Sequence, residues 1–322
     1  HFSVKIFDNR VFGQRKLLAR RIFRNIFAVQ NKNYDSMKSF IYFFKKFRTA
    51  SVLNLAGLAI AFAAFFVFMT QVRYAQTFNR GLTDYENLYR LELRLGFFID
   101  RWFTTCSRPL AEELKKLPQV EGVALYDGWG YDDILDKEGT EMIVRRIEML
   151  PDALEVLAPQ LIVGSLRARP GEIIIPRSFA EKYFDGEVMV AGRTVRTQEG
   201  KEITVTGVYE DFPENSILSN GCYYDLGDDQ NSMNWNNYNY NVFLRLNPNA
   251  DAEEFNAALV DNVRKILAVG YGGGNLDEMS AEDRKDLEET VNSVDARAVP
   301  VAETYFSGVN PAQDKGNRGL QL

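Results

Sequence analysis

The sequence predicts an α+β protein that is anchored by one N-terminal membrane-spanning helix. Residues 49–72 contain no charged side chain and consist mainly of Leu, Ala, Ile, Phe and Val. Residues 1–50 carry 12 Lys and Arg against 2 acidic side chains, whereas the remaining 272 residues carry 26 basic and 42 acidic ones. Beyond the apolar run, strand and helix patterns intermix without a regular βα repeat. A basic head, an apolar run and an acidic body indicate parts that lie in different environments.

The uncharged run is long enough to cross a bilayer. Its 24 residues extend roughly 36 Å as an α-helix, against about 30 Å for the hydrocarbon core. A buried helix of a soluble protein is usually shorter and keeps a polar stripe, and a cleaved signal peptide does not normally begin about 50 residues into a chain. We therefore predict a transmembrane helix over residues 51–72.

Basic residues flank the predicted span. Lys45, Lys46 and Arg48 precede it, and Arg73 follows it. Because positively charged residues stay in the cytoplasm, the N-terminus is expected inside the cell and the residues after about 73 outside. A basic segment also attracts phosphate, but its position directly before an apolar span favours membrane lipid over nucleic acid as its partner.

Two interpretations of residues 1–36 stay open. Apolar residues from Leu18 to Val29 recur at helical spacing between arginines, which is typical of a basic amphipathic helix on the anionic cytoplasmic leaflet. Alternatively, translation starts at Met37, directly before the basic flank, and the upstream residues are not part of the protein. Amphipathicity does not separate these two interpretations.

The residues after the span are predicted to form a stalk (73–84) and then the α+β domain. Residues 78–91 contain few helix breakers except Gly81, so they are expected to continue the span as a helix. Strands are expected where apolar and polar residues alternate, and helices where Ser107, Asp251 or Ser280 provides an N-cap. The expected strands are 88–95, 120–129, 140–150, 172–175, 188–197, 202–209, 218–226, 239–246 and 294–301, and the expected helices are 107–117, 179–184, 251–267 and a charged helix from 280.

Six pieces of the sequence follow one another in the order seen in one family of transport proteins. The chain resembles FtsX-like ABC transporter permeases with a MacB-like periplasmic core domain, especially those of Bacteroidetes. It departs from the family in lacking the usual His within residues 215–218. The pieces are FRTASVLNLAGLAIAFAAFFVF at 47–68, YENLYRLEL at 85–93, PLAEELKKLPQVEGV at 109–123, EIIIPRSFAEKYFDGE at 172–187, GRTVRTQEGKEITVTGVYEDFPENSIL at 192–218 and NYNVFLRLNPNADAEEFNAAL at 239–259.

The resemblance implies a discontinuous periplasmic domain over residues 85–305. An α/β part would come from 85–165 and 236–305, with a mostly β part from 166–235 inserted between them. Permeases of this family normally continue into three more transmembrane helices. Residues 306–322 resemble the lead-in to the second of these helices, so we expect the chain to be truncated there.

The resemblance further implies a permease subunit of the mechanotransmission type in the bacterial inner membrane, with its N-terminus in the cytoplasm and its main domain in the periplasm. Its expected partners are a cytoplasmic ABC ATPase, a second copy or paired permease, and an envelope or outer-membrane protein. The domain would have no catalytic role and no cofactor. The alternatives are a single-pass sensor or adaptor that binds a ligand outside the membrane, and a membrane-tethered hydrolase using paired carboxylates.

Few residues suggest chemistry that depends on histidine or cysteine. The only histidine is His1, so a histidine-dependent triad or a His-rich metal site within the folded body is excluded. Cys106 and Cys222 lack the spacing of a zinc or redox motif. Outside the cytoplasm they could form a disulfide, or they could be two buried thiols, because geometry decides between the two.

Acidic and aromatic clusters offer weaker candidates for a binding site. The acidic clusters lack the regular ligand spacing of a calcium loop, so we expect solvated surface loops and no metal site. The aromatic residues within 234–240 are expected to turn into the core at the start of the next strand. The acidic clusters comprise Asp132, Asp133 and Asp136, and Asp225, Asp228 and Asp229.

Overall fold

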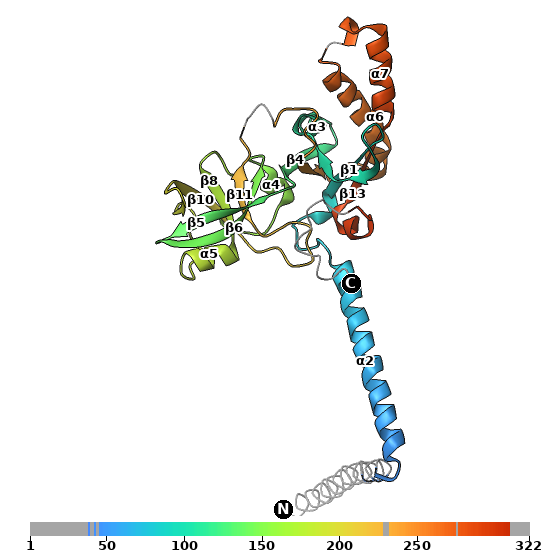
Figure 1. Ribbon diagram of the computed structural model, residues 1–322, viewed down its shortest axis with the longest axis vertical. Helices are drawn as coiled ribbons and strands as arrows, with labels where there is room; N and C mark the ends of the chain where they lie inside the picture. The colour runs from blue at the N-terminus through green and yellow to red at the C-terminus, as the bar shows by residue number, and fades with distance from the viewer. Residues whose placement is uncertain (1–37, 39–41, 43–44, 228–231, 275, 310–322) are drawn as a thin grey trace, which may run out of the picture. The chain divides into compact units, whose positions relative to one another are not determined.

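The structure, a computed structural model, describes residues 38, 42, 45–227, 232–274 and 276–309 (Figure 1). The chain divides into two compact units, His1–Gln71 and Val72–Leu322, close to the predicted end of the span at residue 72. The amphipathic segment expected at residues 18–29, and residues 310–322 of the expected lead-in, lie outside the described residues.

Helix α2 (Arg48–Gln76) contains the whole apolar run. Within the described part of the chain it is the one helix that is long and apolar enough to cross a membrane, and none of its most apolar stretch is buried. Large side chains such as Leu58, Phe62 and Phe66 are exposed along it. An exposed apolar surface of this length is typical of a helix that faces lipid. The apolar N-terminal helix expected from the sequence is confirmed.

The helix does not continue to residue 91. It ends at Gln76, residues 77–84 form turns, and the short 3₁₀-helix η1 (Tyr85–Asn87) leads into strand β1 (Leu88–Leu95). Asn79 has a φ of 58°, in the left-handed region that interrupts a right-handed helix and that Asn tolerates better than most residues. The prediction of a helical stalk over residues 78–91 is therefore wrong.

The second unit is an α+β domain, as predicted. Its helix starts follow the expected caps. The Asp251 carboxylate accepts from two backbone N–H groups of α6 (Ala252–Tyr271), and the Ser280 hydroxyl accepts from one of α7 (Ala281–Asn292). The remaining elements are β2 (Ile99–Phe103), β3 (Thr105–Cys106), α3 (Arg108–Leu114), β4 (Val120–Asp127), β5 (Tyr131–Lys137), β6 (Thr140–Met149), α4 (Ala153–Leu157), β7 (Leu161–Gly164), β8 (Glu172–Pro176), α5 (Arg177–Tyr183), β9 (Thr194–Thr197), β10 (Glu202–Tyr209), β11 (Cys222–Asp225), β12 (Tyr240–Leu246), α6 (Ala252–Tyr271), η2 (Leu276–Glu278), α7 (Ala281–Asn292), β13 (Val294–Pro300) and η3 (Val301–Phe306).

Strands β4, β12, β1 and β13 lie side by side in this order and pair antiparallel. Figure 1 shows α6 and α7 beside β1 and β13. Helix α6 contributes Phe255, Leu259, Val263 and Leu267 to the core on this face. Ile266 lies at helical spacing from Phe255, Leu259 and Val263, but it is only partly buried, at the edge of the same cluster.

Six further strands close a ring of hydrogen-bonded pairs. Strand β6 pairs with β5, β5 with β9, β9 with β10, β10 with β8, β8 with β11, and β11 with β6 again. A closed ring of this size has an interior that side chains fill. Ile173, Val205 and Tyr224 belong to the core cluster of this six-stranded ring. Phe179 of α5 and Phe184, which directly follows α5, belong to the same cluster.

The six-stranded ring bears on two expectations from the sequence. Strand β5 pairs with β9, and β6 pairs with β11. These pairings favour a mostly β part that begins before β5 and not at residue 166. The division at residue 166 stays a prediction. In addition, Asp132, Asp133 and Asp136 lie within strand β5, so the expectation that they form a loop is wrong.

Strand β1 is buried on both faces, although its alternating pattern predicted a half-buried strand. Leu91 and Leu93 enter the main core, and Arg90 and Glu92 on the opposite face are 1% and 0% exposed. The Glu92 carboxylate accepts from the guanidinium groups of Arg90 and Arg297. Burial lowers the pKa of Arg90, and the hydrogen bond to Glu92 opposes this shift. Charge pairing makes the burial tolerable.

Candidate functional site: a three-segment junction

Three segments that lie far apart in the sequence meet in the second unit. They are the end of α2 with the turn that follows it (residues 73–82), the loop 212–218, and the 3₁₀-helix η3. We call their meeting point the three-segment junction. It joins the residues that directly follow the apolar helix to the last described residues of the chain.

Asn79 lies at the centre of the three-segment junction and is 1% exposed. Its Nδ2 donates to the carbonyl oxygen of Val301 and to Oγ1 of Thr304, each at 2.9 Å. Its Oδ1 accepts from the backbone N–H of Ile217 at 2.6 Å, and its own N–H donates to the carbonyl of Asn215 at 2.9 Å. One amide side chain of the first segment thus bonds to both other segments and uses both of its polar atoms.

The last turn of α2 is bonded directly to the loop 212–218. Nδ2 of Asn215 donates to Oγ1 of Thr77 at 2.7 Å, and the Tyr74 hydroxyl donates to the carbonyl of Glu214 at 3.3 Å. A Cβ atom placed on Gly81 would lie 3.3 Å from Cγ of Pro213, so a side chain at residue 81 would press against the Pro213 ring. These contacts hold the helix end against the loop.

Aromatic rings connect the helix end to η3. The ring centroids of Phe78 and Tyr305 are 5.3 Å apart, and those of Tyr74 and Tyr305 are 6.0 Å apart. Phe78 is buried, while Tyr305 and Phe306 keep exposed surface. Tilted and edge-on aromatic pairs at such separations contribute about 0.5–1.5 kcal/mol beyond their burial. The exposed rings of η3 therefore lie beside the end of the apolar helix.

The chain after η3 is held by the buried ion-pair group of β1. Nη2 of Arg90 donates to Oγ of Ser307 at 2.7 Å and to the carbonyl of Val309 at 3.0 Å. The same guanidinium is oriented by Glu92. The guanidinium of Arg90, on a central strand, therefore holds residues 307–309 in place through charge-assisted hydrogen bonds.

Several kinds of contact hold the three-segment junction together. It contains hydrogen bonds, aromatic packing and one left-handed residue, and these tie three backbones together without a flexible spacer. Among the described residues no group of three or more His, Cys, Asp and Glu is placed to hold a metal ion. What the arrangement provides is a hydrogen-bonded and packed connection between the residues after α2 and those that follow η3.

The basic residues predicted to flank the membrane are exposed. Lys45 and Lys46 precede α2, Arg48 is its first residue, and Arg73 lies in its last turn. The ammonium group of Lys46 lies 5.7 Å from the ring centroid of Phe47. Nothing in these positions tests contact with lipid headgroups, so the role of the four residues stays a prediction.

The other residues singled out from the sequence are spread over the domain. Cys106 and Cys222 are buried free thiols in different core clusters. Asp133 and Asp225 approach the same pocket of the six-stranded ring. Tyr240 enters the core, with Trp235 and Tyr238 packed at its edge, so the expectation for residues 234–240 is confirmed. Residues 228 and 229 lie outside the described part.

Sequence reasoning did not identify Asn79. The usable signal was local: Asn-Arg-Gly at residues 79–81 directly follows an apolar helix, and both Asn and Gly favour left-handed backbone. That signal predicts a turn at this place. It does not predict that the Asn79 side chain bonds to Ile217 and Val301, which lie 138 and 222 positions further along the sequence.

The fold and the three-segment junction define a class: an α+β domain attached to an apolar helix of membrane-spanning length. The family model for the MacB-like periplasmic core domain matches residues 51–262. The chain therefore belongs to the MacB-like periplasmic core domain family, as its sequence resemblance implied. No curated protein matches the chain.

Solved structures with a similar arrangement include three domains of transport-related proteins. A domain from a protein described as a permease of Porphyromonas gingivalis is 20% identical, covering 68% of this chain and 92% of that chain with a TM-score of 0.49. The periplasmic region of MacB from Actinobacillus actinomycetemcomitans is 15% identical, covering 60% and 87% with a TM-score of 0.41. The extracellular domain of the noncanonic ABC-type transporter YknZ from Gram-positive bacteria is 15% identical, covering 58% and 95% with a TM-score of 0.39.

The family membership and the apolar helix together define the kind of protein. The chain carries the periplasmic domain of ABC transporter permease-type proteins, and it has a helix that can anchor it in a membrane. A family of this kind is a transporter component and not an enzyme in the usual sense.

Proposed function

We propose that the chain is a permease subunit of the mechanotransmission type, in which ATP hydrolysis on one side of the membrane moves the domain on the other side. α2 would cross the bacterial inner membrane with its N-terminus in the cytoplasm. The flanking residues Lys45, Lys46 and Arg48 support this orientation through the positive-inside rule. The acidic domain would then lie in the periplasm.

The observation that carries the proposal is the three-segment junction. In a mechanotransmission protein, a displacement of the membrane helix must reach the external domain without being absorbed by a flexible linker. Asn79 and the Tyr74–Tyr305 contact join the end of α2 to η3 and to the loop 212–218. Packed elements with fixed contacts move as units, whereas segments with few contacts do not transmit displacement.

The family also supports the proposed partners. FtsX-like and MacB-like permeases belong to ABC transporters and work with an ATPase. We propose a cytoplasmic ABC ATPase as the motor, a second copy of the chain or a paired permease beside it, and an envelope or outer-membrane protein in contact with the external domain.

Co-purification tests the proposal. The protein encoded by the complete reading frame is expressed together with the neighbouring genes, purified in detergent through a tag on this chain, and assayed for ATP hydrolysis. The proposal expects a bound subunit with ATPase activity. This activity should disappear when the phosphate-loop lysine of that subunit is changed to alanine.

The variants Asn79→Ala and Asn236→Ala add a matched comparison in the same complex. Asn236 is exposed and its side chain is not part of the three-segment junction. Both variants should bind the ATPase, but only Asn79→Ala should alter the dependence of ATP hydrolysis on the external partner. A purified protein that carries no ATPase subunit would contradict the proposal.

A further inference from the structure

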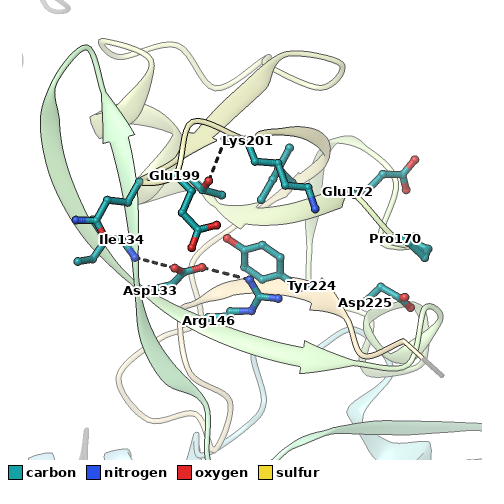
Figure 2. Close-up of a pocket in the computed structure, with 13 residues that line it drawn as sticks. Asp133, Ile134, Arg146, Pro170, Glu172, Glu199, Lys201, Tyr224 and Asp225 are labelled. Carbon is teal, nitrogen blue, oxygen red and sulfur yellow. Dashed lines mark hydrogen bonds and ion pairs between the residues drawn. The ribbon is translucent and has the colours of Figure 1, made fainter. Parts of the chain in front are cut away.

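The six-stranded ring has an open mouth that forms a pocket of about 330 Å³. Mouths of β-barrels are common ligand sites, and this volume is at the small end of the roughly 300–1,000 Å³ found for such sites. Figure 2 shows the side chains that surround it. Each of the six strands contributes a lining residue: Asp133 of β5, Arg146 of β6, Glu172 of β8, Thr197 of β9, Ile203 of β10 and Tyr224 of β11.

Tyr224 gives this pocket an unused polar group. The residue is 4% exposed, and its hydroxyl has no hydrogen-bond partner among the described residues. In Figure 2 the hydroxyl points into the space beside Glu199 and Lys201. A buried hydroxyl without a hydrogen-bond partner destabilises a fold, so a partner that enters the pocket would remove this cost.

The ring face of Tyr224 is already occupied. The Arg146 guanidinium lies 4.0 Å from the ring centroid and is also paired with Asp133 at 3.3 Å and with Glu148 at 3.1 Å. Two carboxylates therefore neutralise this cation. Burial raises the pKa of the Tyr224 phenol, so the hydroxyl stays protonated and neutral. What remains for a ligand is the hydroxyl, not the aromatic face.

The charges around the pocket favour a cation. Its lining contains four carboxylates, from Asp133, Glu172, Glu199 and Asp225, against two cations. An anionic ligand would be repelled by these carboxylates. No group of three or more potential metal ligands occurs among the described residues, so the carboxylates surround a space without converging on one point. Such a distribution suits an elongated organic cation better than a metal ion.

We propose that the mouth of the six-stranded ring binds a small organic amine, whose ammonium group donates to the Tyr224 hydroxyl and is neutralised by Glu199. An ammonium group has three donors and no acceptor, so it can bond to a phenol oxygen and a carboxylate together. The ammonium can belong to a free diamine or to a lysine side chain. This binding is separate from the proposed coupling, because Tyr224 is not part of the three-segment junction.

Isothermal titration calorimetry on the full chain in detergent micelles tests the proposal. The probes are cadaverine for a free diamine, Nα-acetyl-lysine amide for a lysine side chain, and glutarate as the anionic comparison. At least one amine should bind and glutarate should not. Tyr224→Phe should weaken amine binding about tenfold, because one hydrogen bond to a charged group is lost.

A matched pair of carboxylate variants locates the binding. Glu199→Gln should weaken amine binding roughly two- to threefold at low salt, as expected for the loss of one exposed charge. Glu288→Gln, on the exposed surface of α7, should leave amine binding unchanged. Tyr224→Phe removes a buried hydroxyl that has no partner among the described residues, so the variant should still fold. A cooperative thermal unfolding transition would confirm this. The proposal is overturned if neither amine binds, if glutarate binds instead, or if amine binding is the same in Tyr224→Phe.

Discussion

Replacement of Asn79 by alanine should destabilise the external domain substantially. The variant loses three side-chain hydrogen bonds, to Val301, Thr304 and the N–H of Ile217. At about 1 kcal/mol each, these bonds amount to about 3 kcal/mol. Alanine at a φ of 58° adds about 1 kcal/mol, because its Cβ disfavours left-handed backbone. We expect a total loss of about 4 kcal/mol in the free energy of unfolding.

Two comparison variants separate the parts of this loss. Asn79→Gly removes the same hydrogen bonds but relieves the backbone conformation, so it should be less destabilising than Asn79→Ala by about 1 kcal/mol. Asn236→Ala changes an exposed asparagine with an ordinary backbone conformation, and its effect should stay within about 0.5 kcal/mol.

Urea unfolding of the full chain in micelles, followed by tryptophan fluorescence, measures these differences. All three tryptophans lie in the external domain, so the signal reports the unfolding of that unit. A loss below about 1 kcal/mol for Asn79→Ala would contradict this prediction, because the three hydrogen bonds would then contribute almost nothing.

Three further outcomes follow from buried charges and thiols. Glu92→Gln should destabilise the domain by about 3 kcal/mol in the same urea assay, because it leaves the buried guanidinium of Arg90 and the partly exposed guanidinium of Arg297 without their carboxylate. Glu289→Gln on the exposed surface of α7 should have little effect. Burial raises the pKa of Asp127. The Asp127 carboxyl therefore favours folding below its unfolded pKa and loses that contribution as pH rises through its folded pKa. Asp127→Asn should raise the melting temperature at pH 7, and this gain should disappear towards pH 3. Burial also raises the pKa of the Cys106 and Cys222 thiols, so maleimide at pH 7 should modify neither in the folded protein, and rapid labelling of both without urea would contradict their placement.

Local signals were sufficient to predict much of the fold. The uncharged run over residues 51–72 predicts α2 because length and polarity alone decide whether a helix can cross a bilayer. The start of α6 at Asp251 was predictable from its cap, and its buried face from the spacing of Phe255, Leu259 and Val263. Each of these features depends on residues that are close together in the sequence.

The failed and missing predictions depend on contacts that are distant in the sequence. The helix was expected to continue beyond Gln76, but the left-handed turn at Asn79 is stabilised by bonds to segments more than 130 residues away. Arg90 and Glu92 looked solvent-facing because their partners lie on β13 and after η3. The closure of the six-stranded ring rests on the β6–β11 pair, and a strand pattern does not specify its neighbour.

Distances between two copies of the external domain test the proposed coupling most directly. A spin label on Glu288→Cys of α7 would report them in the complex with the ATPase, since this position is exposed while both native cysteines are buried. We expect ATP to shift the distance distribution relative to the nucleotide-free complex, and Asn79→Ala to reduce the shift. An unchanged distribution in the wild type, with ATP hydrolysis intact, would contradict this expectation.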